Sequence, residues 1–185
     1  LAESITAFGN KNPTSYFRLV PHQEAPTNVC WGMSNRSVLV RVPLGWTSGE
    51  DMCHKANNIE PLTARDYSIK QTVEMRSPDA SADIYQLLAG LCVACRHGFE
   101  MANAEAEAER TFADGDIHDP KNAERYATLA QLPDSCAASA DCLERQRKVY
   151  EEYDVFSPAM IDGIIKQLRS CLLYTSDAAD EEDSV

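Results

Sequence analysis

The sequence has no long apolar run and little positive charge. No stretch approaches the roughly 20 consecutive apolar residues that a membrane-spanning helix needs, so no membrane partner is expected. The 185 residues include 17 Lys and Arg against 29 Asp and Glu, which gives a formal net charge of −12. Such a charge repels phosphate backbones, so nucleic acid is not an expected partner either. With 44% hydrophobic and 25% charged residues, the chain has the composition of a globular protein.

The sequence also lacks a second cysteine pair that would complete a zinc site. The seven cysteines are odd in number and irregular in spacing: Cys30, Cys53, Cys92, Cys95, Cys136, Cys142 and Cys171. Cys92 and Cys95 have the spacing of a metal or redox pair, but no other pair stands at a zinc spacing from them. Both lie in a helical apolar segment, so we expect them to pack as small buried hydrophobic residues. Reduced thiols in turn indicate a cytoplasmic protein.

Two proline-closed segments near the start of the chain concentrate arginine and glutamate. In the first, Pro21 and Pro26 bracket Glu24 and stiffen the loop that carries its carboxylate. In the second, valines alternate over residues 38–42 as in a strand with one buried face, so Arg41 is expected on the opposite face. Arginine side chains suit carboxylate or phosphate oxygens, although each of these arginines could equally be an ordinary solvated charge.

A third segment, residues 71–76, also has the pattern of a strand. Glu74 and Arg76 are two positions apart and therefore lie on the same face of it. They could form a structural ion pair, or a metal ligand beside an arginine that binds an anion. The next residues predict a helix start, with Ser77 as the N-cap and Pro78 in the first turn.

Three motifs, in this order and spacing, carry a resemblance to a known family. They are R-L-V-P-x-x-E-A-P at residues 18–26, N-R-S-x-x-x-R-x-P at residues 35–43 and E-x-R-x-P-D at residues 74–79. Together they resemble the C-terminal catalytic half of glutamine synthetase, at motif level over residues 8–85 and more weakly to residue 170. The resemblance implies an α+β fold in which an antiparallel sheet carries the active site and helices back the sheet.

The resemblance implies ATP-dependent ligation of ammonia to L-glutamate through γ-glutamyl phosphate. Arg18 corresponds to an arginine that contacts the glutamate substrate. Glu24 corresponds to a catalytic flap glutamate that helps to deprotonate ammonium, a role that suits a carboxylate on a loop closing over the substrate. Arg76 corresponds to a catalytic arginine that handles the substrate γ-carboxylate and phosphate. The implied partners are therefore L-glutamate, ammonium and ATP.

The resemblance also implies phosphate and metal ligands. Arg36 and Arg41 correspond to arginines that hold the phosphates of ATP and the transferred group, and Arg36 counts as catalytic because its charge stabilises the phosphoryl oxygens. Glu74 corresponds to a ligand of a catalytic Mg²⁺ (or Mn²⁺). In the family, a neighbouring subunit closes the site within a homo-oligomeric ring, which implies a dodecamer. Two alternatives remain open: a γ-glutamyl ligase for another amine such as a polyamine, and a non-catalytic glutamine-synthetase-like structural protein.

The same patterns predict how the chain is divided. We expect residues 1–78 to supply the sheet and the site loops, and residues 79–170 to supply helices that pack against it. Residues 5–20 alternate between apolar and polar and predict a strand that is interrupted at residues 12–13. Residues 44–69 predict an irregular excursion between two strands, a feature that is usually functional or lies at a subunit contact.

Four helices are predicted in the second half. The first follows Ser77 and runs to Arg110; the others cover residues 119–133, 135–153 and 157–170. The core-facing stripe of the first is expected to consist of Ile84, Leu87, Leu88, Leu91 and Cys95. That of the last is expected to consist of Ile161, Ile164, Ile165 and Leu168.

Both ends of the chain indicate a piece of a longer gene. The chain begins with Leu1 and runs almost directly into a family motif, so we expect a fragment. Residues 171–185 are similar to the translated transposon adapter found at the ends of assembled gene fragments, and their acidic composition breaks with what precedes them. We therefore expect this tail to be non-native and disordered.

Overall fold

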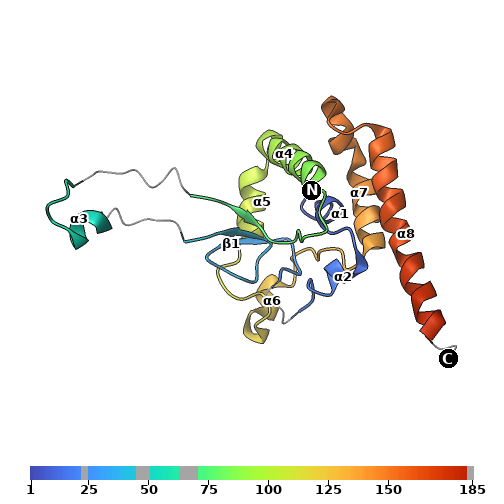
Figure 1. Cartoon of the computed structure of the whole chain (residues 1–185), viewed down its shortest axis with the longest axis horizontal. Helices are drawn as coiled ribbons and strands as arrows, with labels where there is room; N and C mark the ends of the chain where they lie inside the picture. The colour runs from blue at the N-terminus through green and yellow to red at the C-terminus, as the bar shows by residue number, and fades with distance from the viewer. Residues whose placement is uncertain (22–24, 45–50, 63–70, 183–185) are drawn as a thin grey trace.

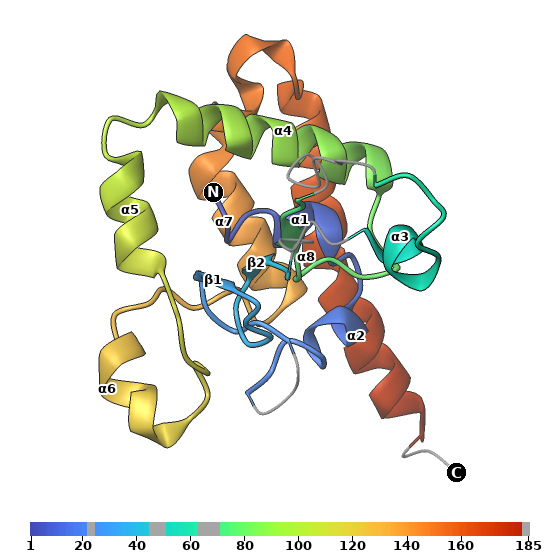
Figure 2. The same cartoon turned by 90° about the vertical axis from the view of Figure 1, so that its left-hand side faces the viewer.

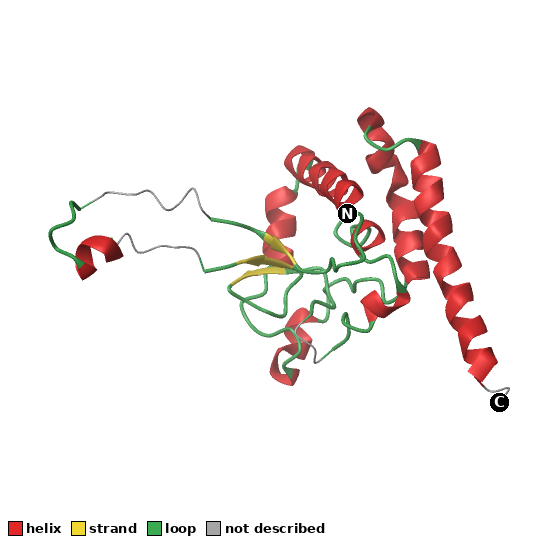
Figure 3. Cartoon of the chain, viewed as in Figure 1, coloured by secondary structure: helices red, strands yellow, loops and turns green. Residues whose placement is uncertain are grey.

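The protein is an α+β chain, as the resemblance implied, with several helices around a small sheet (Figure 3). A computed structural model describes residues 1–21, 25–44, 51–62 and 71–182, with side chains as far as residue 171. The strands are β1 (Trp31–Met33), β2 (Val40–Val42) and β3 (Glu74–Met75). The helices are α1 (Thr6–Gly9), α2 (Pro13–Tyr16), α3 (Met52–Ala56), α4 (Ile84–Glu100), α5 (Ala104–Thr111), α6 (Ala123–Tyr126), α7 (Cys136–Glu151) and α8 (Pro158–Glu182), with 3-10 turns η2 (Pro120–Asn122) and η3 (Glu152–Asp154). In the described part of the chain, no helix has the length and apolar character needed to cross a bilayer.

The main core lies where α1 meets α4, α7 and α8 (Figure 1). Phe8 of α1 stacks on Phe156 at 5.2 Å between ring centroids and meets the edge of Tyr150 at 5.1 Å. Gly90 of α4 lies directly against the Phe8 ring, because a Cβ added there would come within 2.8 Å of it. Helices α7 and α8 follow each other in the chain and run side by side in both views (Figures 1 and 2). Helix α1, from the start of the chain, packs against both of them.

The predicted stripe of the last helix is confirmed. Its four members, Ile161, Ile164, Ile165 and Leu168, are all buried in the main core. The helix also begins where the sequence predicted, at Pro158. Helix α7 covers nearly all of the predicted span of residues 135–153, and its N-cap Ser135 accepts a hydrogen bond from the backbone N–H of Ala138. Both helices show a one-sided apolar pattern, which is why the sequence located them well.

The sheet differs from the wholly antiparallel one that was expected. Strand order is β1-β2-β3, with β1 parallel to β2 and β2 antiparallel to β3. After β1 the chain turns at Ser34, which has a left-handed φ of 53°, and it returns in the original direction instead of forming a hairpin. The sheet is therefore mixed, and its antiparallel pair is the one that places Arg41 opposite Glu74.

Residues 5–20 form helices α1 and α2, and the predicted strand there is wrong. Residues 4–11 are all buried, polar and apolar alike, so the alternation does not mark a buried and an exposed face. The buried hydroxyls find partners across the core: Ser4 bonds the Tyr150 hydroxyl at 2.7 Å and Thr6 bonds the Ser139 hydroxyl at 2.6 Å. Such pairing offsets the cost of burying polar groups.

Helix α4 starts later and ends earlier than predicted. It begins at Ile84, where Asp83 is the N-cap and accepts hydrogen bonds from the backbone N–H groups of the first turn, whereas Ser77 is fully buried in the preceding loop. Met101–Asn103 then separates α4 from α5, so the predicted continuous helix to Arg110 is wrong.

The predicted apolar stripe of α4 is only partly buried. Ile84 and Leu88 are 65% and 55% exposed, and the residues of this helix that are fully buried are Gly90 and Val93. Cys92 and Cys95 are both exposed, so the prediction that these two thiols pack in the core is wrong. The buried face of α4 is centred on a glycine, which a search for large apolar residues does not identify.

Two further segments carry more helix than expected. Helix α8 continues through Glu182, so the described part of the tail is helical instead of disordered; its non-native origin stays a prediction. Within the expected irregular excursion of residues 44–69, the structure describes helix α3, which Asp51 caps. Residues 45–50 and 63–69 of that excursion lie outside the described part of the chain.

The helix predicted over residues 119–133 is shorter in the structure, where only η2 and α6 are helical.

Candidate active site

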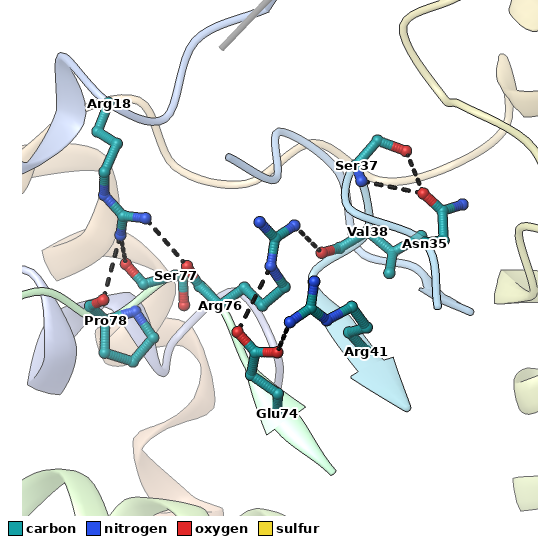
Figure 4. Close-up of polar contacts among 9 residues, drawn as sticks. All are labelled: Arg18, Asn35, Ser37, Val38, Arg41, Glu74, Arg76, Ser77 and Pro78. Carbon is teal, nitrogen blue, oxygen red and sulfur yellow. Dashed lines mark hydrogen bonds and ion pairs between the residues drawn. The ribbon is translucent and has the colours of Figure 1, made fainter. Parts of the chain in front are cut away.

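Glu74 lies between two arginines at the centre of the predicted site (Figure 4). Its Oε2 atom is 2.5 Å from Nη2 of Arg41, and its Oε1 atom is 3.8 Å from Nε of Arg76. The Arg41 contact follows from the register of β2 and β3, which places Arg41 directly opposite Glu74. The Arg76 contact joins residues two positions apart, as the sequence predicted, although Arg76 directly follows β3 and does not belong to it. Two guanidinium groups around one carboxylate leave a net positive charge.

The arginines of this cluster are more buried than its carboxylate. The side chains of Arg76 and Arg41 are 11% and 24% exposed, whereas that of Glu74 is 42% exposed. Arg76 is held by its backbone N–H to the carbonyl of Leu39 at 2.9 Å and by Nη1 to the carbonyl of Val38 at 3.3 Å. Nε of Arg41 is buried and has no hydrogen-bond partner among the described residues. A buried donor without a partner is costly, so an anion that reached it would be stabilised.

Arg36 is exposed on the loop between β1 and β2, and Asn35 organises that loop. The Oδ1 atom of Asn35 accepts hydrogen bonds from the backbone N–H and the hydroxyl of Ser37, at 2.9 and 2.8 Å. Its Nδ2 atom donates to the carbonyls of Ala113 and Gly115, at 3.1 and 2.8 Å. Sequence reasoning missed this role, although an Asn two positions before a Ser is typical of side chains that close a turn.

Arg18 reaches the same end of β3 from the loop after α2, and its guanidinium is occupied by backbone carbonyls (Figure 4). It donates to the carbonyls of Arg76, Ser77 and Pro78 at 3.3, 2.6 and 3.1 Å. The structure therefore brings four of the predicted residues to one region, namely Arg18, Arg41, Glu74 and Arg76. Glu24, the predicted flap glutamate, lies outside the described residues.

A surface cavity of about 290 Å³ lies beside Arg18. It is lined by Asn12, Thr14, Ser15, Arg18, Asp79, Ala80 and Ser81. Burial alone would raise the pKa of Asp79, but hydrogen bonds from Ser15, Ser81 and Asn10 outweigh it and hold that pKa below its usual value. The cavity is thus lined by the positively charged Arg18 and by the ionised carboxylate of Asp79. This pairing suits a ligand that carries one negative and one positive charge.

The described residues form no complete metal site. Among them, no three His, Cys, Asp or Glu side chains converge as ligands. Glu74 is partly exposed and offers two oxygens, the ligand type that Mg²⁺ prefers. Mg²⁺ commonly takes one or two carboxylates together with substrate phosphates, so Glu74 fits as one ligand of a site that other oxygens must complete.

The cluster indicates a type of chemistry, and the sequence comparison shows the family. A sheet end that gathers guanidinium groups around one carboxylate is suited to stabilising charge on phosphoryl or carboxylate oxygens. Comparison of the sequence agrees: the profile of the glutamine synthetase catalytic domain matches residues 1–171. The chain therefore belongs to the glutamine synthetase family.

Individual relatives support this membership at modest identity. The chain is 32% identical to glutamine synthetase of Streptomyces coelicolor over 161 residues, which are 87% of this chain and 29% of that protein. It is 31% identical to the Pyrococcus abyssi glutamine synthetase over 174 residues, 94% of this chain and 34% of that protein. The Mycolicibacterium smegmatis protein is 31% identical over 168 residues, 91% of this chain and 30% of that protein. The chain thus spans about a third or less of the length of these relatives.

Proposed function

We propose that the chain supplies part of the active site of an ATP-dependent ligase that joins ammonia to L-glutamate through γ-glutamyl phosphate. The single observation that carries the proposal is the convergence of Arg41, Glu74 and Arg76 where β2 and β3 pair. Family membership and the name shared by the relatives support the same reaction. The proposal also places the protein in the cytoplasm and in a homo-oligomeric ring, as the family resemblance implies.

In this proposal the arginines bind and orient the phosphorylated groups. Arg41 on β2 and Arg76 directly after β3 face the same carboxylate, so a phosphoryl group placed there would meet two guanidinium groups. Arg36, exposed on the adjoining loop, adds a third positive charge that can approach the nucleotide. Arg18 holds the backbone next to Arg76 and orients the glutamate substrate from the other side. Glu24 accepts the proton that ammonium loses.

The divalent cation would be held in part by Glu74. When bound, such an ion neutralises charge on the phosphates of ATP. Glu74 would then exchange at least one of its arginine contacts for the cation, which its partly exposed side chain permits. The freed guanidinium of Arg41 would gain phosphate oxygens as partners, and its buried Nε atom would be the first group to benefit.

One observation favours a second candidate, a glutamine-synthetase-like protein that does not catalyse. Glu74 is already engaged at both oxygens, so its role here is compatible with a structural ion pair that joins β2 to β3. The two candidates differ in one measurable respect. A metal ligand must change the metal dependence of activity, whereas a structural ion pair must not.

The test is Glu74→Gln in a full-length protein that carries these residues. The substitution keeps the shape of the side chain and removes its charge. Loss of a metal ligand should move the Mg²⁺ or Mn²⁺ dependence of glutamine formation to at least about 10-fold higher metal concentration. The free energy of unfolding should fall by less than about 1 kcal/mol, because exposed ion pairs contribute little.

Glu107→Gln is the matched control. Glu107 is 41% exposed and lies 2.5 Å from Arg110, so Glu107→Gln breaks an ion pair of the same length, with a carboxylate of similar exposure, away from the site. Its metal curve should overlay that of the parent. If the Glu74→Gln curve overlays it as well, or if that variant unfolds, Glu74 is structural and the catalytic proposal for this cluster fails.

A further inference from the structure

Helix α4 presents two thiols on one exposed face. Cys92 and Cys95 are both exposed, whereas Val93 between them is 2% exposed and faces the core. Side chains three positions apart lie on the same side of a helix, with about 5–6 Å between their Cβ atoms. The two thiols therefore lie on the same face of one helix, which also carries the exposed Leu88 and Phe99.

The surroundings leave this pair open to a ligand. Gly98 follows Cys95 by one turn, and a Cβ added at Gly98 would meet nothing within 4 Å. The other thiols of the second half and Cys30 are less accessible: Cys30, Cys136 and Cys142 are buried, and Cys171 is partly buried and donates to the carbonyl of Lys11. Cys53 is exposed on α3, which Figure 1 shows far from α4.

The geometry restricts what two such thiols can do. A disulfide needs Cβ atoms about 3.5–4.5 Å apart, closer than two helical positions of this spacing provide, so direct oxidation would distort α4. A four-coordinate ion such as Zn²⁺ needs further ligands, and in the described part of the chain no third His, Cys, Asp or Glu joins the pair. A single soft ion between two thiolates spans a longer distance between the sulfur atoms than a direct S–S bond does, and it needs no third ligand.

We propose that Cys92 and Cys95 form a dithiol site for one soft, thiophilic ion of low coordination number, with Cu(I) as the chemical class. Thiolates are the ligands that select such ions. Binding forms two S–Cu bonds and releases up to two thiol protons to the solvent, and neither copper nor sulfur changes oxidation state. The site is independent of the proposed ligase chemistry, because α4 contributes none of the arginine and glutamate residues of that site.

The test uses the reduced 185-residue chain without oxygen, titrated with Cu(I) against a chromophoric Cu(I) chelator. The parent should hold one Cu(I) per chain more tightly than any single thiol allows. Cys92→Ser and Cys95→Ser should each weaken that binding about 10²-fold or more, because the second sulfur acts at high effective concentration once the first has bound. Both positions are exposed, so serine should leave the circular dichroism spectrum unchanged.

Cys53→Ser is the matched control, since it removes an exposed thiol that has no neighbour on its own helix. It should leave Cu(I) affinity and stoichiometry unchanged. The proposal is overturned if either α4 variant keeps the parent affinity, or if Cys53→Ser loses as much as they do. A copper-dependent dimer in size-exclusion chromatography would overturn it too, because the ion would then bridge two chains instead of two positions on one helix.

Discussion

Asp79 joins two segments of the chain through one carboxylate and one backbone amide. Its Oδ1 atom accepts hydrogen bonds from the backbone N–H and the hydroxyl of Ser81, at 2.7 and 2.6 Å. Its own N–H donates to the carbonyl of Gly9 at 3.0 Å, at the end of α1. The carboxylate therefore fixes the loop that carries the backbone carbonyls to which Arg18 donates.

Asp79→Asn should lower the free energy of unfolding by about 1 kcal/mol near neutral pH, because hydrogen bonds to a charged acceptor are stronger than those to a neutral one. The pKa of Asp79 is lowered in the folded state from its ordinary 3.8. Its contribution is thus fully present above that value and is lost as pH falls through the folded pKa. Urea unfolding should show parent and variant converging below about pH 4; a difference that stays constant with pH would contradict this role.

Individual residues show what a sequence pattern can and cannot predict about the site. The proximity of Glu74 and Arg76 was predictable, because a two-residue spacing on a strand puts both on one face. The stronger contact from Arg41 was not, since it depends on which residues of β2 and β3 pair. Register between strands is set by tertiary packing, which local spacing does not contain.

At the scale of elements, α4 offers a test of where a helix begins. The sequence favours Ser77 as the cap, but in the structure Asp83 accepts hydrogen bonds from the backbone N–H groups of Tyr85 and Gln86, both at 3.1 Å. Asp83→Ala should therefore cost about 1 kcal/mol of stability. Ser77→Ala should be close to neutral, because the buried Ser77 hydroxyl has no hydrogen-bond partner within the described part of the chain. Thermal unfolding measures the stability of both variants. If Ser77→Ala lost more stability than Asp83→Ala, Ser77 would be the cap instead.

The two glycines of α4 should respond in opposite directions to the same substitution. Gly90→Ala places a Cβ about 2.8 Å from the Phe8 ring, which is itself locked by Tyr150 and Phe156, so overpacking should cost about 1–3 kcal/mol. Gly98→Ala meets open space and should raise stability by up to about 1 kcal/mol, since alanine is the better helix former. Denaturant midpoints measure both. Equal effects would mean that α4 does not pack on Phe8 through Gly90.

The prediction of α7 and α8 succeeded because one face of each helix is buried, and that of α1 failed because all of its residues are buried. Helices α7 and α8 have polar outer faces, and their apolar positions recur with helical period. Helix α1 is buried on all sides, so Ser4 and Thr6 lie in the core beside Ile5 and Phe8. No periodicity marks such a segment, because the contrast between water and core that creates the pattern is missing.

At the scale of the molecule, the arginine-glutamate cluster is open to solvent. The Glu74 side chain is 42% exposed, whereas the proposed reaction of an acyl phosphate with ammonia would require water to be kept out. The sequence could predict the family and the residue types at this site, because three motifs in fixed order carry both. It could not predict what covers the site, since the chain corresponds to only 29–34% of the length of the relatives compared.

Residues 1–170 on their own should therefore show no glutamine synthesis from ATP, ammonium and L-glutamate. Among the described residues, no three His, Cys, Asp or Glu side chains converge as metal ligands, so the divalent cation of the proposed reaction would not be held in place. Even if ATP bound to the arginines, the exposed cluster would not exclude water from the intermediate. The assay is release of phosphate together with formation of glutamine, with the Streptomyces coelicolor enzyme as the positive control. Measurable turnover that depends on Mg²⁺ and disappears in Glu74→Gln would show that these residues already make a complete site, and that the cation needs no ligands beyond those of this chain and its substrates.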